Sequence, residues 1–378
     1  MAHVKTNHRD SGSDTYTVRW RDNGRFRKRT FRVKRDAERF ALSIHADLVQ
    51  GRSTLPHQVR GKTVRECVDA LMELAVFDLK PRSVHGYWQV YNQHVLPVFG
   101  ARRIATLTRE DVDRWVAGLV ASGLSPATVR GIYVALSKVC AYAVTYEHAA
   151  QNPCAGTILP KVPKYAARFL TPQEVERVAC VLDEHPPYGL IVRVAAFSGL
   201  RAGELAALRI RDVDLMHRRI LVSRTVARIA GEWVVGTPKS ARSTRTVPIL
   251  SADLHRDLVV YLGQHPRRSD PEAALWPGRR PGNGYPLDYD RVYDHECYMR
   301  SYFRPSADAV GLAGVRFHDL RHTFASLMAA AGVALIDVSG WMGHASVSTT
   351  DSVYRHLYET DNAPERERVA AYLAQQGS

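Results

Sequence analysis

VRFHDLRHTFASLMAAAGVALIDVSGWMGHASVSTTDSVYRHLY, residues 315–358, gathers reactive side chains more densely than any other part of the chain. If residues 318–322 are helical, His318, Arg321 and His322 stand at positions i, i+3 and i+4 and share one face. The apolar residues that follow keep helical spacing, so the polar cluster lies on the first turn, where the helix dipole favours an anion. This stretch therefore predicts an anion-binding site at the start of a helix.

A second helix is expected downstream. Gly332 ends the first helix, and an amphipathic run then carries Leu335, Val338 and Trp341 to a stop at Gly343. His344 follows directly, and Tyr354 comes ten positions later.

Another cationic residue, Arg201, lies just past Ser198-Gly199, where an apolar helix should end. We expect Arg201 to open a further helix that runs through Leu205 and Leu208. Taken alone, it could be a surface arginine paired with Glu204.

Lys239 lies in a turn-forming segment, residues 238–241, between strand-like runs at 232–235 and 244–249. This order predicts a hairpin with Lys239 at its tip. Without further context, a lysine at a turn is usually only solvated.

In their order and spacing, Arg201, Lys239, His318-Asp-Leu-Arg321, Gly343-His344 and Tyr354 resemble the tyrosine recombinase family of the phage-integrase type. Each motif is weak alone, and the combination is specific. Where the family usually has threonine, this chain has Ser198, which is also a small hydroxyl residue.

The resemblance implies an enzyme that cuts and rejoins DNA through a 3′-phosphotyrosine bond. In the implied catalytic set, Arg201 and Arg321 bind the phosphate, and His344 donates a hydrogen bond to it. Tyr354 is the nucleophile, and His318 accepts its proton. Lys239 protonates the leaving 5′ oxygen. Tyr358, one helical turn further on, and Tyr302 are rival nucleophiles. No cofactor or metal is expected, because the phosphotyrosine conserves the bond energy and the sequence has no phosphate-binding GxxxxGKT loop or two-metal acidic cluster.

The composition favours a nucleic-acid partner. The net charge is +14, with fifteen Lys and Arg against six Asp and Glu in the first 63 residues. The five cysteines are scattered, which indicates reduced, structural thiols. With no apolar signal core and no run expected to span a bilayer, the sequence predicts a cytoplasmic protein without membrane contact.

The predicted fold class is multidomain and mainly α with small β-sheets. Residues 1–55 alternate as an arginine-rich hairpin around the turn at 22–24 and continue into a helix at 35–50, which gives a small sheet-plus-helix module. A basic ribbon can enter a DNA groove, although its arginines could also be a solvated face. The resemblance implies an arm-site DNA-binding domain.

Residues 62–150 predict four helices. The capping box Thr63-Val-Arg-Glu66 opens the first, Pro97 and Gly100 should stop the second, Thr108 caps the third, and Ser125-Pro126 opens the fourth. The pattern alone indicates a helical bundle, and the resemblance implies a core-binding domain.

Residues 165–378 form the expected mixed α+β catalytic domain, which opens with the capping box Thr171-Pro-Gln-Glu174. Residues 265–310 are polar, with one helical piece near 291–302, and a short helix is expected after Pro364. The resemblance implies a homotetramer that binds double-stranded DNA at core and arm attachment sites. A host bending factor and a directionality factor are possible partners. The resemblance also implies that the tail docks on a neighbouring subunit.

Four functions compete: an integrase that moves a mobile element, a housekeeping recombinase that resolves replicon dimers, a DNA-binding protein without catalysis, and a type IB topoisomerase. The arm-like module favours the integrase over the housekeeping enzyme. The complete set of six residues argues against a non-catalytic protein.

Overall fold

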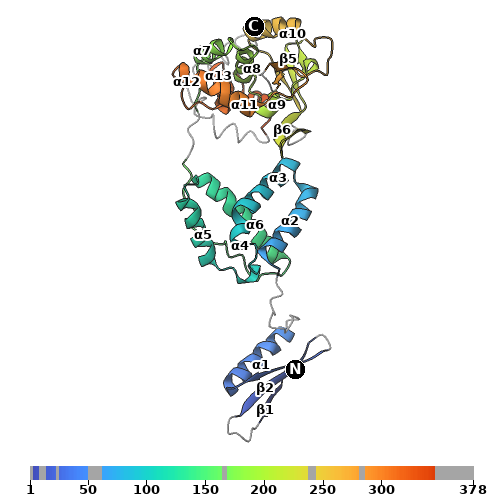
Figure 1. Ribbon diagram of the computed structural model, residues 1–378, viewed down its shortest axis with the longest axis vertical. Helices are drawn as coiled ribbons and strands as arrows, with labels where there is room; N and C mark the ends of the chain where they lie inside the picture. The colour runs from blue at the N-terminus through green and yellow to red at the C-terminus, as the bar shows by residue number, and fades with distance from the viewer. Residues whose placement is uncertain are drawn as a thin grey trace, which may run out of the picture. The chain divides into compact units, whose positions relative to one another are not determined.

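The computed structural model describes residues 3–7, 14–22, 25–49, 62–163, 168–236, 244–280 and 286–344. The chain forms two compact units, Met1–Val162 and Pro163–Ser378. It is mainly helical with small sheets (Figure 1), which confirms the predicted fold class.

The first elements form a three-stranded antiparallel sheet in the order β1-β2-β3, covered on one face by a helix (Figure 1). The strands are β1 (His3–Asn7), β2 (Thr15–Asp22) and β3 (Arg25–Phe31), and the helix is α1 (Lys34–Val49). Val18 and Trp20 of β2 are buried against Ala37 and Ile44 of α1, as the period-two and helical patterns predict. Strand β1 was not predicted, because it has no buried residue and hence no apolar alternation.

Residues 62–163 build a separate helical core. Its elements are α2 (Val64–Asp78), α3 (Pro81–Val90), the π-helix η1 (Tyr91–Val95), α4 (Leu96–Phe99), the 3-10 turn η2 (Ile104–Thr106), α5 (Arg109–Ala121) and α6 (Pro126–Thr145). The capping boxes at Thr63 and Thr108 and the N-cap at Ser125 are all present, so the predicted helix starts are confirmed.

The expectation that Pro97 would stop the second helix is wrong. The chain stays helical to Phe99, because the wider turn η1 lets the Leu96 N–H donate to the Tyr91 carbonyl just before the proline. A proline lacks an N–H and crowds the carbonyl four residues back, and a π-turn relieves both problems locally. Gly100 then caps the helix end.

Helix α6 corrects another expectation. It is long and apolar enough to cross a membrane by length and composition, the one such helix in the described ranges. Its apolar residues, Val129, Leu136 and Val139 among them, instead pack into the core of the helical domain. A core helix of a globular domain passes the same test, so α6 is weak support for a membrane span.

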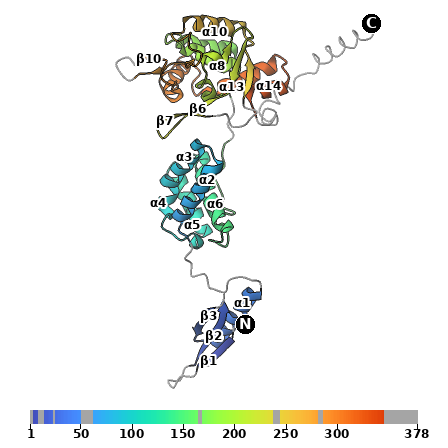
Figure 2. The ribbon, with the colours of Figure 1, turned by 90° about the vertical axis from the view of Figure 1, so that its right-hand side faces the viewer.

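The second unit places helix α8 (Tyr188–Ser198) among three other helices, α7 (Pro172–Leu182), α10 (Ala252–Gln264) and α13 (Phe317–Ala330) (Figure 1; α8, α10 and α13 also in Figure 2). The capping box at Thr171 starts α7 as predicted. Nearly every residue of α8 is buried, so this helix is the centre of the catalytic core. The final described helix is α14 (Leu335–Met342), which ends at Gly343 as predicted.

The small strands pair differently from the sequence prediction. Strand β7 (Glu232–Gly236) pairs with β6 (Thr225–Ile229), which was not predicted, while β8 (Arg245–Pro248) pairs with β5 (Arg219–Val222) next to β4 (Val213–Asp214). The expected hairpin of the 232–235 and 244–249 runs is therefore wrong, because these runs belong to two different sheets. Lys239 lies between β7 and β8, outside the described residues.

The polar region 265–310 holds more structure than predicted. A short ribbon of β9 (Gly278–Arg279) and β10 (Leu287–Asp288) precedes continuous helical turns through α11 (His295–Tyr298), the π-helix η5 (Met299–Phe303) and α12 (Arg304–Ala309). The predicted piece near 291–302 starts too early and ends too soon. As with Pro97, a π-turn lies directly before Arg304-Pro305 and lets the helix continue.

Candidate active site

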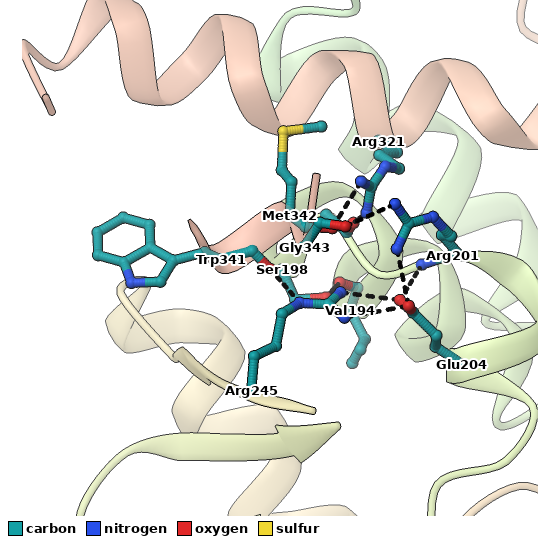
Figure 3. Close-up of polar contacts among 10 residues, drawn as sticks. Val194, Ser198, Arg201, Glu204, Arg245, Arg321, Trp341, Met342 and Gly343 are labelled. Atoms are coloured by element: carbon teal, nitrogen blue, oxygen red, sulfur yellow. Dashed lines mark hydrogen bonds and ion pairs between the residues drawn. The ribbon is translucent and has the colours of Figure 1, made fainter. Parts of the chain in front are cut away.

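The carboxyl end of helix α14 is the meeting point of three arginines from three distant elements (Figure 3). Arg245 Nε donates to the carbonyl of Trp341 at 2.5 Å, Arg321 Nη2 to that of Met342 at 2.6 Å, and Arg201 Nη2 to that of Gly343 at 2.9 Å. The last carbonyls of a helix have no partner within the helix and carry its partial negative charge. Three guanidiniums satisfy them here, so this helix end gathers positive charge.

Arg321 is almost completely buried, with 3% of its surface exposed. From the first turns of α13, its Nη1 also donates to the carbonyl of Gly199, the residue that caps the carboxyl end of α8 through its N–H. Arg321 thus links the ends of two helices. Gly199 has φ +64°, and a Cβ there would lie 2.5 Å from the ring of Phe324, so only glycine fits this corner.

Arg201 precedes a helix shorter than predicted. Helix α9 (Ala202–Leu205) is a single turn, and Leu208 is buried beyond its end. Glu204, 4% exposed, closes this turn by accepting from the Arg201 backbone N–H and from Arg201 Nη1, each at 2.9 Å. The expected Arg201–Glu204 pair is therefore present, and it orients the guanidinium toward α14.

Arg245 is a residue of this cluster that the sequence reasoning missed. It lies on β8 with its side chain 6% exposed, and it donates to both oxygens of Glu204, at 3.0 and 2.8 Å. The signal was its register. Arg245 stands two residues before Val247 on the same strand, so both side chains lie on the same face, and Val247 is fully buried in the core.

Burial alone would raise the pKa of Glu204, but the hydrogen bonds and charge of Arg245, with those of Arg201, lower it below its ordinary value. Glu204 is therefore ionised at neutral pH and balances part of the arginine charge.

The two histidines of α13 stack edge to face. His318 lies in the first turn, and its ring centroid is 4.9 Å from that of His322, one turn further on. Burial and the charges of Arg321 and Arg316 lower the pKa of His318, while burial and His318 lower the pKa of His322 to about 4. Both imidazoles are therefore neutral at pH 7, and a neutral imidazole can accept a proton.

His344 follows directly after the arginine-bound end of α14. Burial, followed by the charges of Arg321 and Arg201, lowers its pKa to about 4. The structure thus brings Arg201, His318, Arg321 and His344 into one electrostatic environment.

Two residues of the predicted set, Lys239 and Tyr354, lie outside the described residues, as does the rival Tyr358. The other rival, Tyr302, packs in an aromatic cluster with Tyr188 and His185. Within the described ranges, no three His, Cys, Asp or Glu side chains come together as a metal site.

Guanidiniums and neutral imidazoles around one helix end form a site suited to a phosphate diester, since they supply charged donors and a proton acceptor together. The chain belongs to the phage integrase family, whose pattern matches residues 168–361, and the family's N-terminal SAM-like domain matches residues 63–120. It is a tyrosine-type site-specific recombinase of the integrase type, an enzyme that breaks and rejoins DNA. The family resemblance noted in the sequence is confirmed.

Among relatives, the chain is 28% identical to the ICEBs1 integrase of Bacillus subtilis (strain 168), over 74% of this chain and 75% of that protein. It is 31% identical to the integrase of Mycobacterium phage FRAT1, over 68% of this chain and 75% of that protein.

Two solved structures share the fold. One is the Tn1549 transposon integrase in complex with transposon right end DNA (TM-score 0.63, 18% identity, 83% of this chain and 100% of that one). The other is a lambda integrase dimer bound to a COC′ core site (TM-score 0.57, 17% identity, 95% of each chain).

The depressed histidine pKa values predict how stability depends on pH. An unfolded histidine takes up a proton near pH 6.5, whereas folded His344 and His322 do so only near pH 4. Between these values the unfolded chain binds more protons at these two histidines, so their contribution to the free energy of unfolding should fall as pH drops from about 6.5 to about 4 and stay constant outside that window. Urea unfolding from pH 4 to 8 measures this. His344→Gln should flatten the slope, and an unchanged slope would contradict the assigned pKa of His344.

Proposed function

We propose that this recombinase integrates and excises a mobile element by cutting double-stranded DNA with Tyr354, which forms a 3′-phosphotyrosine bond. The observation that carries the proposal is the triple-arginine end of α14, where His344 begins the segment that leads to Tyr354. The ICEBs1 and mycobacteriophage integrases among its relatives support the mobile-element reading.

Arg201 and Arg321 would bind the non-bridging oxygens of the scissile phosphate. Charge builds on these oxygens in the transition state, and donors already held in place stabilise it most. Both guanidiniums are held by carbonyls, and Arg201 also by Glu204. A guanidinium has five N–H donors, so the contacts of Arg201 with Glu204 and Gly343 leave donors for a phosphate.

The histidines would divide two tasks. Tyrosine is a weak nucleophile because its phenol has a pKa near 10, and it therefore needs a proton acceptor. His318 is neutral at pH 7 and suits this role, while His344, also neutral, would donate its N–H to a phosphate oxygen.

Lys239 would protonate the departing 5′ oxygen. Acid, base and anion donors are then all side chains of this protein, so the proposed reaction requires neither a metal nor a cofactor.

The domain roles follow the same proposal. Residues 62–150 would hold the core site together with the catalytic domain, residues 165–378, and four subunits would assemble on the DNA. A host bending factor and a directionality factor are possible partners. The cytoplasm would be the site of action.

Residues 1–55 would bind the arm sites through the sheet face that α1 leaves open. In the register of the sheet, Arg19 pairs with Lys28, and Arg21 pairs with Phe26, on the face opposite to buried Val18. Phe26 is 80% exposed, and the Arg21 guanidinium lies 5.0 Å from its ring. A basic, aromatic-bearing open face fits a DNA groove better than it fits a solvated surface.

The arginines of this ribbon lie on both faces of the sheet. Arg29 pairs with Val18 and lies on the helix side, with its guanidinium 4.9 Å from the ring of Phe40. Because the exposed Arg29 covers Phe40 on the helix side of the sheet, we assign DNA contact to the open face only.

The covalent step provides the first test of the function. On a nicked suicide substrate that carries the core site, the protein should form a protease-sensitive adduct at the DNA 3′ end. Tyr354→Phe should form none and still bind DNA, because it lacks only the nucleophilic oxygen. Tyr358→Phe is the matched control and should form the adduct normally. If instead Tyr358→Phe loses the adduct, Tyr358 is the nucleophile. If the unaltered protein forms no adduct, the proposed reaction is refuted.

The role of Lys239 is tested by changing the leaving group. Lys239→Ala should cleave DNA roughly 10²- to 10⁴-fold more slowly, because an alkoxide needs a proton as it departs. Sulfur in place of the bridging 5′ oxygen makes a leaving group that needs none, and Lys239→Ala should then recover most of its rate. Arg201→Ala should not recover, since its partners are the non-bridging oxygens. Equal recovery of both variants, or of neither, would show that Lys239 is not the acid.

The open face of the N-terminal sheet makes a third prediction. Deletion of residues 1–55 should leave core-site cleavage intact and abolish integration that depends on arm sites. The double variant Arg19→Ala, Lys28→Ala should reproduce this loss and lower the salt slope of arm-site binding by roughly 0.9 per lost phosphate contact. Removing the same charge from α1 with Arg35→Ala and Arg39→Ala is the control. If both pairs behave alike, net charge rather than this face binds the arm site.

A further inference from the structure

Arg245 shares one buried carboxylate with a proposed phosphate-binding residue. Its Nη1 and Nη2 donate to Glu204 Oε1 and Oε2, while Arg201 Nη1 donates to the same Oε1. We propose that Arg245 is a positioning residue for DNA cleavage, which acts by holding Glu204 so that the charge and orientation of Arg201 stay available to the scissile phosphate.

The charge balance explains why a second arginine is needed. Arg201 and Glu204 alone would form a neutral pair, and the buried carboxylate would draw the guanidinium toward itself. With Arg245 added, two cations share the Glu204 carboxylate, so these three side chains together carry one net positive charge. Because Arg245 is 6% and Arg201 39% exposed, the buried partner balances the carboxylate while the accessible one faces the phosphate.

Arg245 also contacts the site through the backbone of α14. Its Nε donates to the Trp341 carbonyl, one residue before the carbonyl that Arg321 contacts. At Gly343, with φ +63°, a Cβ would lie 2.9 Å from Arg245 Nη1, so the guanidinium packs directly under the residue that precedes His344. Arg245 therefore also helps to place His344.

A half-buried arginine in the same unit shows what a purely structural pair looks like. Arg224, 18% exposed, pairs with Asp212, 3% exposed, and Asp212 caps the turn at Arg209. This carboxylate also holds a turn, but none of its contacts involves a proposed catalytic residue. Arg224→Gln is therefore a charge-matched control for Arg245→Gln.

The inference rests on the proposed function and is tested by the charge of the substrate. Single-turnover adduct formation is measured at saturating protein on two suicide substrates, one with the normal scissile phosphate and one with a methylphosphonate, in which a methyl group replaces one charged oxygen. The neutral linkage needs less cationic stabilisation, so a variant that withholds the charge of Arg201 should lose less rate on it.

Arg245→Gln should cleave the phosphate substrate roughly 10- to 100-fold more slowly than the unaltered protein. On methylphosphonate the deficit should shrink to less than about threefold. Arg245→Lys restores one charge but not the paired donors, so its cleavage rate on the phosphate substrate should lie between those of Arg245→Gln and the unaltered protein. It also carries the test if Arg245→Gln does not fold, since the same substrate dependence is expected of it. Arg224→Gln should show no substrate-dependent change.

An equal deficit of the Arg245 variants on both substrates, or no deficit at all, would overturn the inference and leave Arg245 as a support of the fold. Failure of the unaltered protein to form any adduct would refute the proposed function itself, and the role of Arg245 with it. The two failures are therefore distinguishable.

Discussion

The catalytic unit depends on how the end of helix α14 is capped. Its last carbonyls accept hydrogen bonds from the guanidiniums of Arg201, Arg245 and Arg321. A helix end normally repels anions, since its carbonyls carry negative partial charge. Three cations reverse that sign, and the same contacts fix where the cations stand. The same contacts thus cap the helix and build the proposed anion site, so the proposed function depends on the contacts that stabilise the helix end.

The histidines are neutral because burial, and after it the same concentration of positive charge, lowers their pKa values. His344, buried beside Arg321 and Arg201, is protonated only at a pH far below the physiological range. An imidazole among fixed cations stays neutral and can take up or share a proton, while the arginines retain their charge at every accessible pH. Burial and charge therefore determine which side chains stay cationic and which stay neutral. The proposed reaction uses these side chains and no metal ion.

Local patterns predicted most element types well. Apolar periodicity placed α13 and α14, capping boxes marked the starts of α2 and α7, the N-cap Thr108 marked the start of α5, and the alternation of β2 identified its buried face. The two helices that run further than predicted both continue past a proline. Pro97 and Pro305 do not stop their helices, because π-turns directly before them absorb the missing N–H and the crowding. Nothing local in the sequence indicates whether the surrounding core will maintain such a turn.

The sequence by itself determined the family, the fold class and the four described members of the proposed catalytic set, because their identity and spacing along the chain are local properties. Strand pairing was decided only by the tertiary structure, since β8 pairs with β5 across an intervening ribbon and not with its neighbour β7. The register of β8 could indicate that Arg245 faces the core, but only the tertiary structure showed that Arg245, 44 residues from Arg201 in sequence, shares the Glu204 carboxylate with it. A buried charge is tolerated only where its partners converge, and that convergence exists in the folded chain and not in any stretch of sequence.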